Sequence, residues 1–234
     1  MFSPAVRPLR DFLRILFPDL CCHCGEPLVG DERYLCTSCM TRITWAGGAD
    51  HPGNNVEQRL IGRIPVEAAA ALLIFRKDSV VQDIMHQIKY HGHDALARQY
   101  GHLLGIELAR SGRFQHIDCV VPVPLHRRKK LERGYNQSEL LAEAVAKDLH
   151  CPVAAHNLYR KRYTDTQTHK SRLDRLDNMA NVIGVRHPEA WAGKHILLVD
   201  DIITTGATSE ACYHALQSIP GLRISVAALA LAGL

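Results

Sequence analysis

Four cysteines near the start of the chain have the spacing of metal ligands. Cys21 and Cys24 form one pair with two residues between them, and Cys36 and Cys39 form another. Two such pairs supply four thiolates, the tetrahedral ligand set of a closed zinc site, and they leave no open position for catalysis. The pattern therefore predicts structural zinc. Disulfides are the alternative, and the charged N-terminal residues, which are unlike a secretory signal, disfavour them.

The identity of the first ligand stays open, because Cys22 also lies inside the first pair and could replace Cys21. Cys21 keeps the better spacing to Cys24. Gly25 follows directly, where a positive φ would help backbone amides to face the sulfurs. The chain between the pairs is long enough for a hairpin that turns near residues 30–31. Three cysteines elsewhere are predicted to be small core residues: Cys119, Cys151 and Cys212.

A second group of polar residues follows an apolar run in the last quarter of the chain. Asp200 and Asp201 come directly after Ile196–Val199, and a Thr/Gly turn then opens an expected helix. Backbone N–H groups of such a turn can surround an anion at the helix N-terminus, and a glycine lets the backbone approach its oxygens closely. The two carboxylates can accept hydrogen bonds from a sugar diol. The predicted phosphate-binding residues are Thr204, Thr205, Gly206, Ala207 and Thr208.

The alternative is an apolar strand followed by an ordinary helix cap, because Asp and Thr are both good capping residues. The presence of all these features in one short run favours the phosphate loop. A Walker A loop is not supported, because the run contains no Gly-Lys-Thr/Ser.

The run from Ile196 to Thr208 resembles the phosphoribosyl-pyrophosphate (PRPP) motif of type I phosphoribosyltransferases. With the cysteine pairs and three further segments, the chain resembles the competence-associated ComF family from Cys21 to about Leu231. The three segments are Lys89-Tyr90-x-Gly92, Val121–Leu125 followed by Arg133–Gln137, and Thr166-Gln167 with Arg175 and Asn178.

The resemblance implies that the chain binds PRPP together with Mg²⁺. Asp200 and Asp201 would be the catalytic residues, which position the ribose and favour the positive charge of an oxocarbenium-like transition state. Mg²⁺ would be held mainly by ligand oxygens and waters, with at most one or two carboxylates. A locally basic stretch would bind the pyrophosphate through Pro124, Leu125, His126, Arg127 and Arg133.

The resemblance also implies that Tyr159–Asn178 forms a flexible loop, which closes over the site and excludes water. Its expected site residues are Arg162, Thr164, Gln167 and Lys170. Two positions depart from the family's pattern. Lys170 stands where an apolar residue is expected, and Ile183 stands where an aromatic residue is expected. Both departures concern details of the substrate.

Three functions fit these features. The first is an enzyme that transfers a phosphoribosyl group to a small acceptor, in a ComF-type role associated with DNA uptake and natural transformation. The second is a non-catalytic module that binds single-stranded DNA or a helicase-like competence partner, although only 6% of the residues are aromatic, which leaves few bases to be stacked. The third is PRPP binding that regulates a partner. None of the 14 histidines stands out as a general base.

Apolar periodicity predicts the elements that position these residues. Strands are expected over Ala68–Phe75, Cys119–Val123, His195–Ile202 and Ile224–Ala230. Helices are expected over residues 80–88, 96–108, 138–149 and 209–218. Alternating strands and helices indicate an α/β fold, a mostly parallel sheet with helices on both faces, as in type I phosphoribosyltransferases. Ligands of such sheets bind beyond the carboxyl ends of the strands, which selects the loops after Val123 and Val199.

Composition and turn residues suggest two modules. The chain has 234 residues, a formal net charge of +4 and 47% hydrophobic residues, which is ordinary for a globular protein. Residues 1–45 are predicted to hold a short amphipathic helix and the zinc module, 46–66 a Gly- and Asn-rich linker, and 67–234 the phosphoribosyltransferase-like domain. No apolar run reaches the roughly 20 residues of a spanning helix. Membrane insertion is therefore not expected, and a cytosolic location is predicted.

Overall fold

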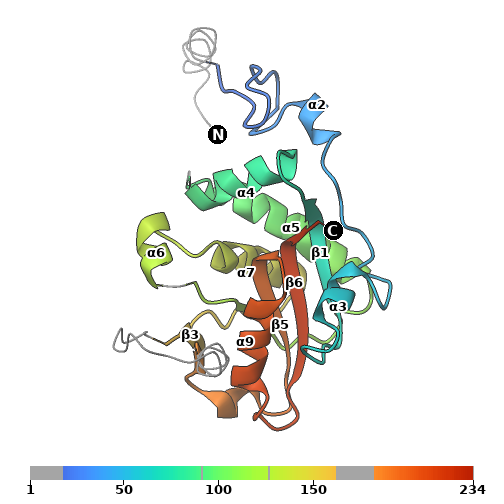
Figure 1. Cartoon of the computed structure of the whole chain (residues 1–234), viewed down its shortest axis with the longest axis vertical. Helices are drawn as coiled ribbons and strands as arrows, with labels where there is room; N and C mark the ends of the chain where they lie inside the picture. The colour runs from blue at the N-terminus through green and yellow to red at the C-terminus, as the bar shows by residue number, and fades with distance from the viewer. Residues whose placement is uncertain (1–17, 91, 126, 162–181, 234) are drawn as a thin grey trace, which may run out of the picture.

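The computed structural model describes residues 18–90, 92–125, 127–161 and 182–233 (Figure 1). The short amphipathic helix expected before Pro18 lies outside these ranges. Among the described helices, none is long and apolar enough to cross a membrane.

A parallel four-stranded sheet lies at the centre of the molecule. Its strands are β1 (Ala69–Phe75), β2 (Cys119–Pro122), β5 (His195–Ile203) and β6 (Arg223–Ala232), in the order β1-β6-β5-β2. β5 and β6 occupy the middle and are nearly continuous apolar runs, as expected for strands covered on both faces. Each strand matches a predicted one to within one or two residues at either end, so the expected parallel α/β fold is confirmed.

Helices cover both faces of this sheet. α4 (Val80–Tyr90), α5 (Asp94–Arg110) and α7 (Gln137–Asp148) share a core with Leu197 and Val199 of β5. α3 (Asn55–Leu60) and α9 (Ala207–Leu216) share a second core with the alternate residues Ile196 and Leu198. Because successive side chains of a strand point to opposite faces, the four residues Ile196–Val199 are enough to define both layers. The carboxyl ends of the strands point toward α4 (Figure 1).

Shorter elements lie around the sheet. They are α2 (Thr37–Met40), α6 (Arg127–Arg133), the 3-10 helix η2 (Pro188–Trp191), and the antiparallel pair β3 (Leu158–Arg160) and β4 (Ile183–Val185). Ile183, which stands where the family pattern led us to expect an aromatic residue, is buried in β4.

Two segments expected to be irregular are helical. Within residues 46–66, for which a linker was predicted, α3 begins after the Asn54 side chain, which accepts hydrogen bonds from the N–H groups of Val56 and Glu57. Leu60 of this helix is fully buried. In the basic stretch, α6 carries mostly charged side chains, and Leu131 is 76% exposed. Neither helix has an apolar stripe long enough for periodicity to reveal it.

The contact between α5 and α7 allows a first prediction. A Cβ added at Gly101 would lie 2.8 Å from the Cβ of Ala144 and 3.1 Å from the carbonyl oxygen of Leu141. Gly101→Ala should therefore lower the free energy of unfolding by about 1–3 kcal/mol through overpacking, although alanine is the better helix former. Urea denaturation measures the effect. The exposed Gln99→Ala on the same helix should change it by less than about 0.5 kcal/mol, and a stabilised Gly101→Ala would contradict the packing.

Candidate functional site: a four-cysteine cluster and a phosphate loop

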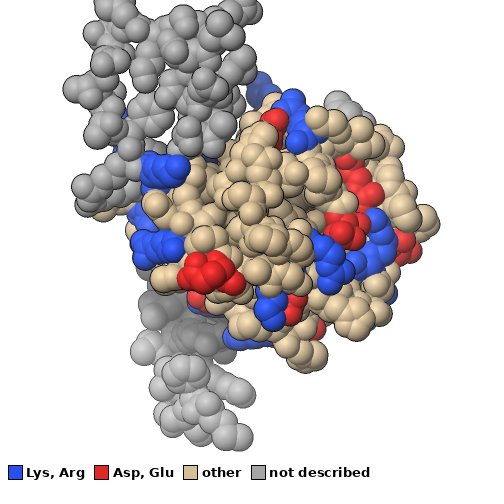
Figure 2. Space-filling model, turned by 90° about the horizontal axis from the view of Figure 1, so that it is seen from below, with Lys and Arg blue, Asp and Glu red and all other residues tan. Residues whose placement is uncertain are grey.

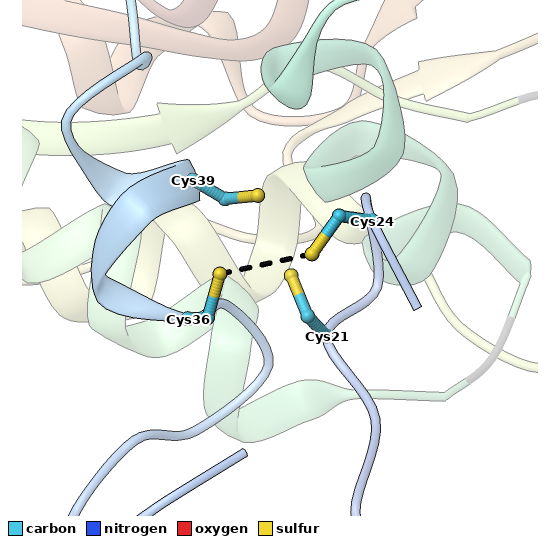
Figure 3. A group of neighbouring side chains, drawn as sticks. All are labelled: Cys21, Cys24, Cys36 and Cys39. Atoms are coloured by element: carbon cyan, nitrogen blue, oxygen red, sulfur yellow. Dashed lines mark hydrogen bonds between the residues drawn. The ribbon is translucent and has the colours of Figure 1, made fainter. Parts of the chain in front are cut away.

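The four predicted metal ligands lie together. The Sγ atoms of Cys21, Cys24, Cys36 and Cys39 are all within 4.8 Å of one another, and each points toward a common centre (Figure 3). The Sγ atoms of Cys24 and Cys36 are 3.7 Å apart. A tetrahedral zinc with Zn–S bonds of about 2.3 Å places its sulfurs about 3.8 Å apart. The donor set therefore fits zinc, and all eight cysteines are free thiols.

Local backbone geometry shapes this cluster. Gly25 has the expected positive φ of 75°, and its N–H donates to the carbonyl of Cys21 at 3.0 Å. Burial raises the pKa of the Cys21 thiol, but N–H groups of Cys24, Cys36 and His23 outweigh burial and lower it to about 6. Cys21 thus forms a thiolate readily, which is the form that binds metal. Cys22 is not part of the cluster and packs against the core instead.

The cysteine module is docked on the α/β domain. Cys21, Leu35 and Cys39 are buried in the same core as α4 and α5. His23, between the first two ligands, lies 2.7 Å from the carboxylate of Asp83 in α4, measured from Nδ1 to Oδ2. This contact attaches the module to the helix that lies above the carboxyl ends of the strands.

The predicted phosphate loop joins the central strand β5 to α9. The helix begins after Gly206, whose φ of 81° is in the left-handed region. A Cβ there would also lie 2.9 Å from Cδ2 of Leu60, so this position needs glycine for both conformation and space. The N–H of Ala207 donates to Oγ1 of Thr205 at 3.4 Å. The loop therefore presents a helix N-terminus directly after the two carboxylates, as the sequence predicted.

The two adjacent carboxylates have different surroundings. Burial, and then the charge of Asp201, raises the pKa of Asp200 to about 7. The N–H of Asp201 and Oγ of Ser138 donate to Oδ1 of Asp200 at 2.8 and 3.4 Å. Asp201 instead forms an ion pair with Lys89, with 3.1 Å between Oδ2 and Nζ. Burial thus raises the pKa of one carboxyl, while the other carboxylate is paired with a lysine.

A cavity of about 210 Å³ opens beside this pair at the carboxyl ends of the strands. It brings together residues from both predicted loops. From the phosphate loop and its carboxylates these are Asp200, Asp201, Thr204 and Thr208, and from the pyrophosphate stretch they are Pro124, Leu125 and Arg133.

The remaining predicted residues lie elsewhere or outside the described ranges. Thr205 lines a separate groove with Arg59 and Arg63 of the α3 region. Gly206 and Ala207 do not line the cavity itself. His126, the Arg127 side chain and the flexible-loop residues Arg162, Thr164, Gln167 and Lys170 lie outside the part of the chain that the structure describes.

Comparison with known proteins identifies the family. The family described as the phosphoribosyl transferase domain matches residues 136–233, which contain α7, both carboxylates and the phosphate loop. DNA utilization protein YhgH of Salmonella typhi is 34% identical over 202 residues, which are 82% of this chain and 87% of that protein. Competence protein F of Haemophilus influenzae is 25% identical over 219 residues, 90% of this chain and 96% of that protein. The chain belongs to the ComF family.

Other relatives match a shorter part. DNA utilization protein YhgH of Escherichia coli K12 is 34% identical over 128 residues, which are 53% of this chain and only 56% of that protein. The domain match and the parallel sheet together give this ComF-family chain a type I phosphoribosyltransferase-like fold, preceded by a four-cysteine cluster.

The cavity of this ComF-family chain has further polar residues to which sequence reasoning gave no role. Gln137, at the first position of α7, is only 1% exposed, yet its Nε2 has no hydrogen-bond partner. Its Oε1 accepts from Nη1 of Arg133 at 3.0 Å, so the amide N–H groups are the free end. Arg160 donates from Nε to the carbonyl of Pro124 at 3.0 Å. Gln137 and Lys89 lie in quoted motifs, and Arg160, which was expected in the flexible loop, lies in β3. No sequence signal marked Ser138.

The cysteine cluster predicts which thiol is the first metal ligand. Cys21→Ser should reduce bound zinc well below one per chain, because it leaves three thiolates, and should lower the melting temperature. Cys22→Ser, its neighbour outside the cluster, should retain about one zinc per chain. Metal content by mass spectrometry of the purified variants is the measurement. If Cys21→Ser retained zinc and Cys22→Ser lost it, the assignment of Cys21 as the first ligand would be wrong.

The raised pKa of Asp200 predicts the pH dependence of stability. Between its ordinary value of 3.8 and about 7, the folded protein binds more protons at this carboxyl than the unfolded chain does. Its contribution to the free energy of unfolding therefore falls as pH rises through this window. Asp200→Asn should be more stable relative to the parent at pH 8 than at pH 5.5, as measured by urea denaturation at each pH.

Asp118→Asn is the matched control for this effect. Hydrogen bonds from the His195 N–H and Lys194 lower the pKa of Asp118, so its titration lies below the same window. The stability of Asp118→Asn relative to the parent should be equal at pH 5.5 and pH 8. If the difference in free energy of unfolding between Asp200→Asn and the parent were also independent of pH, the pKa of Asp200 would not be raised in the folded protein.

Proposed function

We propose that this protein binds PRPP with Mg²⁺ and transfers a phosphoribosyl group to a small acceptor. One observation carries the proposal. A single cavity contains a carboxylate pair and the N-termini of α7 and α9, together with the basic side chains of Lys89, Lys129 and Arg133. Helix N-termini and basic groups attract phosphates, whereas carboxylates accept hydrogen bonds from hydroxyl groups. PRPP has these groups in the matching order, with a phosphate at one end, a ribose diol in the middle and a pyrophosphate at the other end.

The proposed placement follows the lining of the cavity. The 5′-phosphate would bind at residues 204–208, where Thr204 and Thr208 line the cavity. Asp200 and Asp201 would accept hydrogen bonds from the ribose diol. The pyrophosphate would lie between Pro124, Leu125 and the free amide of Gln137, close to Arg133. The unpaired N–H groups of Gln137 support an acceptor-rich ligand, because a buried donor without a partner is costly in the empty site.

The proposed reaction breaks the bond between C1 of the ribose and the pyrophosphate oxygen and forms a bond from C1 to a nitrogen of the acceptor. Positive charge would develop on the ribose, where the adjacent carboxylate groups of Asp200 and Asp201 would stabilise it electrostatically. Negative charge develops on the leaving pyrophosphate, where Arg133 and Lys129 stabilise it. Bound Mg²⁺ would neutralise part of the charge of the diphosphate, held mainly by ligand oxygens and water with at most one of the two carboxylates.

The cellular role that we propose is a ComF-type one in DNA uptake or use, in the cytosol. It is supported by family membership and by the names of the relatives, DNA utilization protein and competence protein F. The four-cysteine cluster would hold structural zinc in this role.

Thermal unfolding with and without PRPP and Mg²⁺ tests ligand binding. A ligand at 100 times its dissociation constant should stabilise the protein by about 2.7 kcal/mol, which for a chain of this length raises the melting temperature by roughly 5–10 °C. The shift should disappear in the double variant Asp200→Asn, Asp201→Asn. The absence of a shift in the parent at millimolar PRPP would refute PRPP binding.

Release of pyrophosphate tests catalysis separately. The parent, supplied with PRPP, Mg²⁺ and a panel of nucleobases and amines, should release pyrophosphate faster with at least one acceptor than without any. Binding of PRPP without such release would favour the regulatory role, in which PRPP binding controls a partner.

The second candidate is binding of single-stranded DNA or of a helicase-like partner that carries it. Tyr90 is 60% exposed beside the cavity, and the guanidinium of Arg133 lies 5.3 Å from the centre of its ring. An exposed aromatic ring with basic neighbours can stack a base and hold the adjacent phosphate. At the opposite end of the molecule, by contrast, Lys and Arg are interspersed with Asp and Glu over the described surface (Figure 2).

Salt dependence and one substitution test this candidate. Oligodeoxythymidine binding should weaken steeply between 50 and 200 mM salt, as backbone contacts require, and should weaken by roughly 5- to 100-fold in Tyr90→Ala. Trp45→Ala, which removes an exposed aromatic ring elsewhere, is the control. Equal binding by the parent and by Tyr90→Ala would exclude the proposed platform.

A further inference from the structure

α3 forms the back of the phosphate loop. The guanidinium of Arg59 donates from Nη1 to the carbonyl of Thr204, and from Nη2 to the carbonyl of Ala232 at 3.3 Å. One side chain thus joins the phosphate loop to the end of β6. Leu60, the next residue, is fully buried and lies directly behind Gly206.

The direction of the Thr204 carbonyl determines which way the N–H of Thr205 points, because both belong to one planar peptide. In a trans peptide the C=O and the next N–H point in opposite directions, and the described residues contain no cis peptide. Arg59 and Thr205 line the groove behind the loop, whereas Thr204 and Thr208 line the cavity in front. A carbonyl held toward Arg59 therefore turns the N–H of Thr205 away from Arg59. The reverse orientation would place a carbonyl oxygen against a phosphate and repel it.

We propose that Arg59 is a positioning residue for the phosphate loop, so that α3 belongs to the ligand site. The inference rests on the proposed function, in which this loop binds the 5′-phosphate of PRPP. A bond from a guanidinium to a carbonyl is charge-assisted, and the fork of an arginine spans two carbonyls where a lysine ammonium is a point charge. The substitution Arg59→Lys should therefore restore only part of what Arg59→Ala removes.

Two measurements on the full-length, zinc-loaded protein test the proposal. The first is NMR relaxation dispersion of the amides of Thr205, Gly206 and Ala207 without any ligand. In Arg59→Ala these amides should show new exchange on the microsecond-to-millisecond timescale. The second is calorimetric binding of ribose 5-phosphate, PRPP and inorganic pyrophosphate, each with Mg²⁺.

Ligand selectivity separates positioning from general damage. Ribose 5-phosphate and PRPP should each bind about 10-fold more weakly to Arg59→Ala, which corresponds to the loss of one charge-assisted hydrogen bond. Pyrophosphate should bind as it does to the parent, which shows that the rest of the cavity is intact. Arg98→Ala is the control, because its guanidinium pairs instead with the carboxylate of Glu143, between α5 and α7. It should change neither the dynamics nor the affinities.

Each failure has a distinct meaning. Loop amides in Arg59→Ala that behave as in the parent would overturn the positioning role, whatever the ligands do. A loss of PRPP affinity without a loss for ribose 5-phosphate would also overturn it, because the effect would then lie at the pyrophosphate. A parent that binds neither phosphoribosyl compound would refute the proposed function instead, and the loop dynamics alone would still decide whether Arg59 holds the loop.

Discussion

Two adjacent carboxylates at the end of a central strand are the constraint around which this molecule is arranged. Asp200 is 8% exposed and sits next to the charged Asp201, a combination that is unfavourable unless other groups offset it. Lys89 from α4 neutralises one carboxylate, and Ser138 from α7 donates to the other. The ends of α4 and α7 must therefore converge on the end of β5, and this convergence forms the cavity. Without these acidic residues, the ends of α4 and α7 would not have to converge on the end of β5.

α4 links this constraint to the cysteine cluster. Asp83 in its first turn contacts His23, between two of the clustered cysteines, and Lys89 in its last turn pairs with Asp201. Its apolar face, with Ile84 and Ile88 fully buried, fixes the helix against the sheet between those two contacts. A closed zinc site would thus act on the cavity through the placement of α4, which is consistent with a structural metal. The module lies beyond α4, on the side to which the strands' carboxyl ends point (Figure 1).

Much of this arrangement could be predicted because its signals are local. Continuous apolar runs such as Ile196–Val199 specify buried strands, and regular spacing of Val81, Ile84 and Ile88 specifies an amphipathic helix. The run at residues 200–208 and the cysteine pairs are short motifs. The residue types and their spacing are enough to predict a phosphate site for the first and a metal site for the second. α3 was missed because its six residues are held by long-range contacts, such as the hydrogen bond from the N–H of Ala69 to Glu57. The pairing of Lys89 with Asp201 likewise requires that the ends of α4 and β5 lie side by side. No local sequence pattern indicates this.

The two carboxyls place little uncompensated negative charge in the middle of the cavity. A site with two full negative charges would repel a ligand that carries phosphates at both ends. Here Lys89 compensates one charge and burial suppresses the other near neutral pH. The helix N-termini and the free amide of Gln137 can then attract an anion without strong opposition from the middle of the site. In the proposed complex with PRPP, ionisation of Asp200 would create the stronger hydrogen-bond acceptor for the ribose diol. Under the proposed function, burial of Asp200, normally a cost to the fold, would thereby let one small cavity accept both the hydroxyl groups and the phosphates of PRPP.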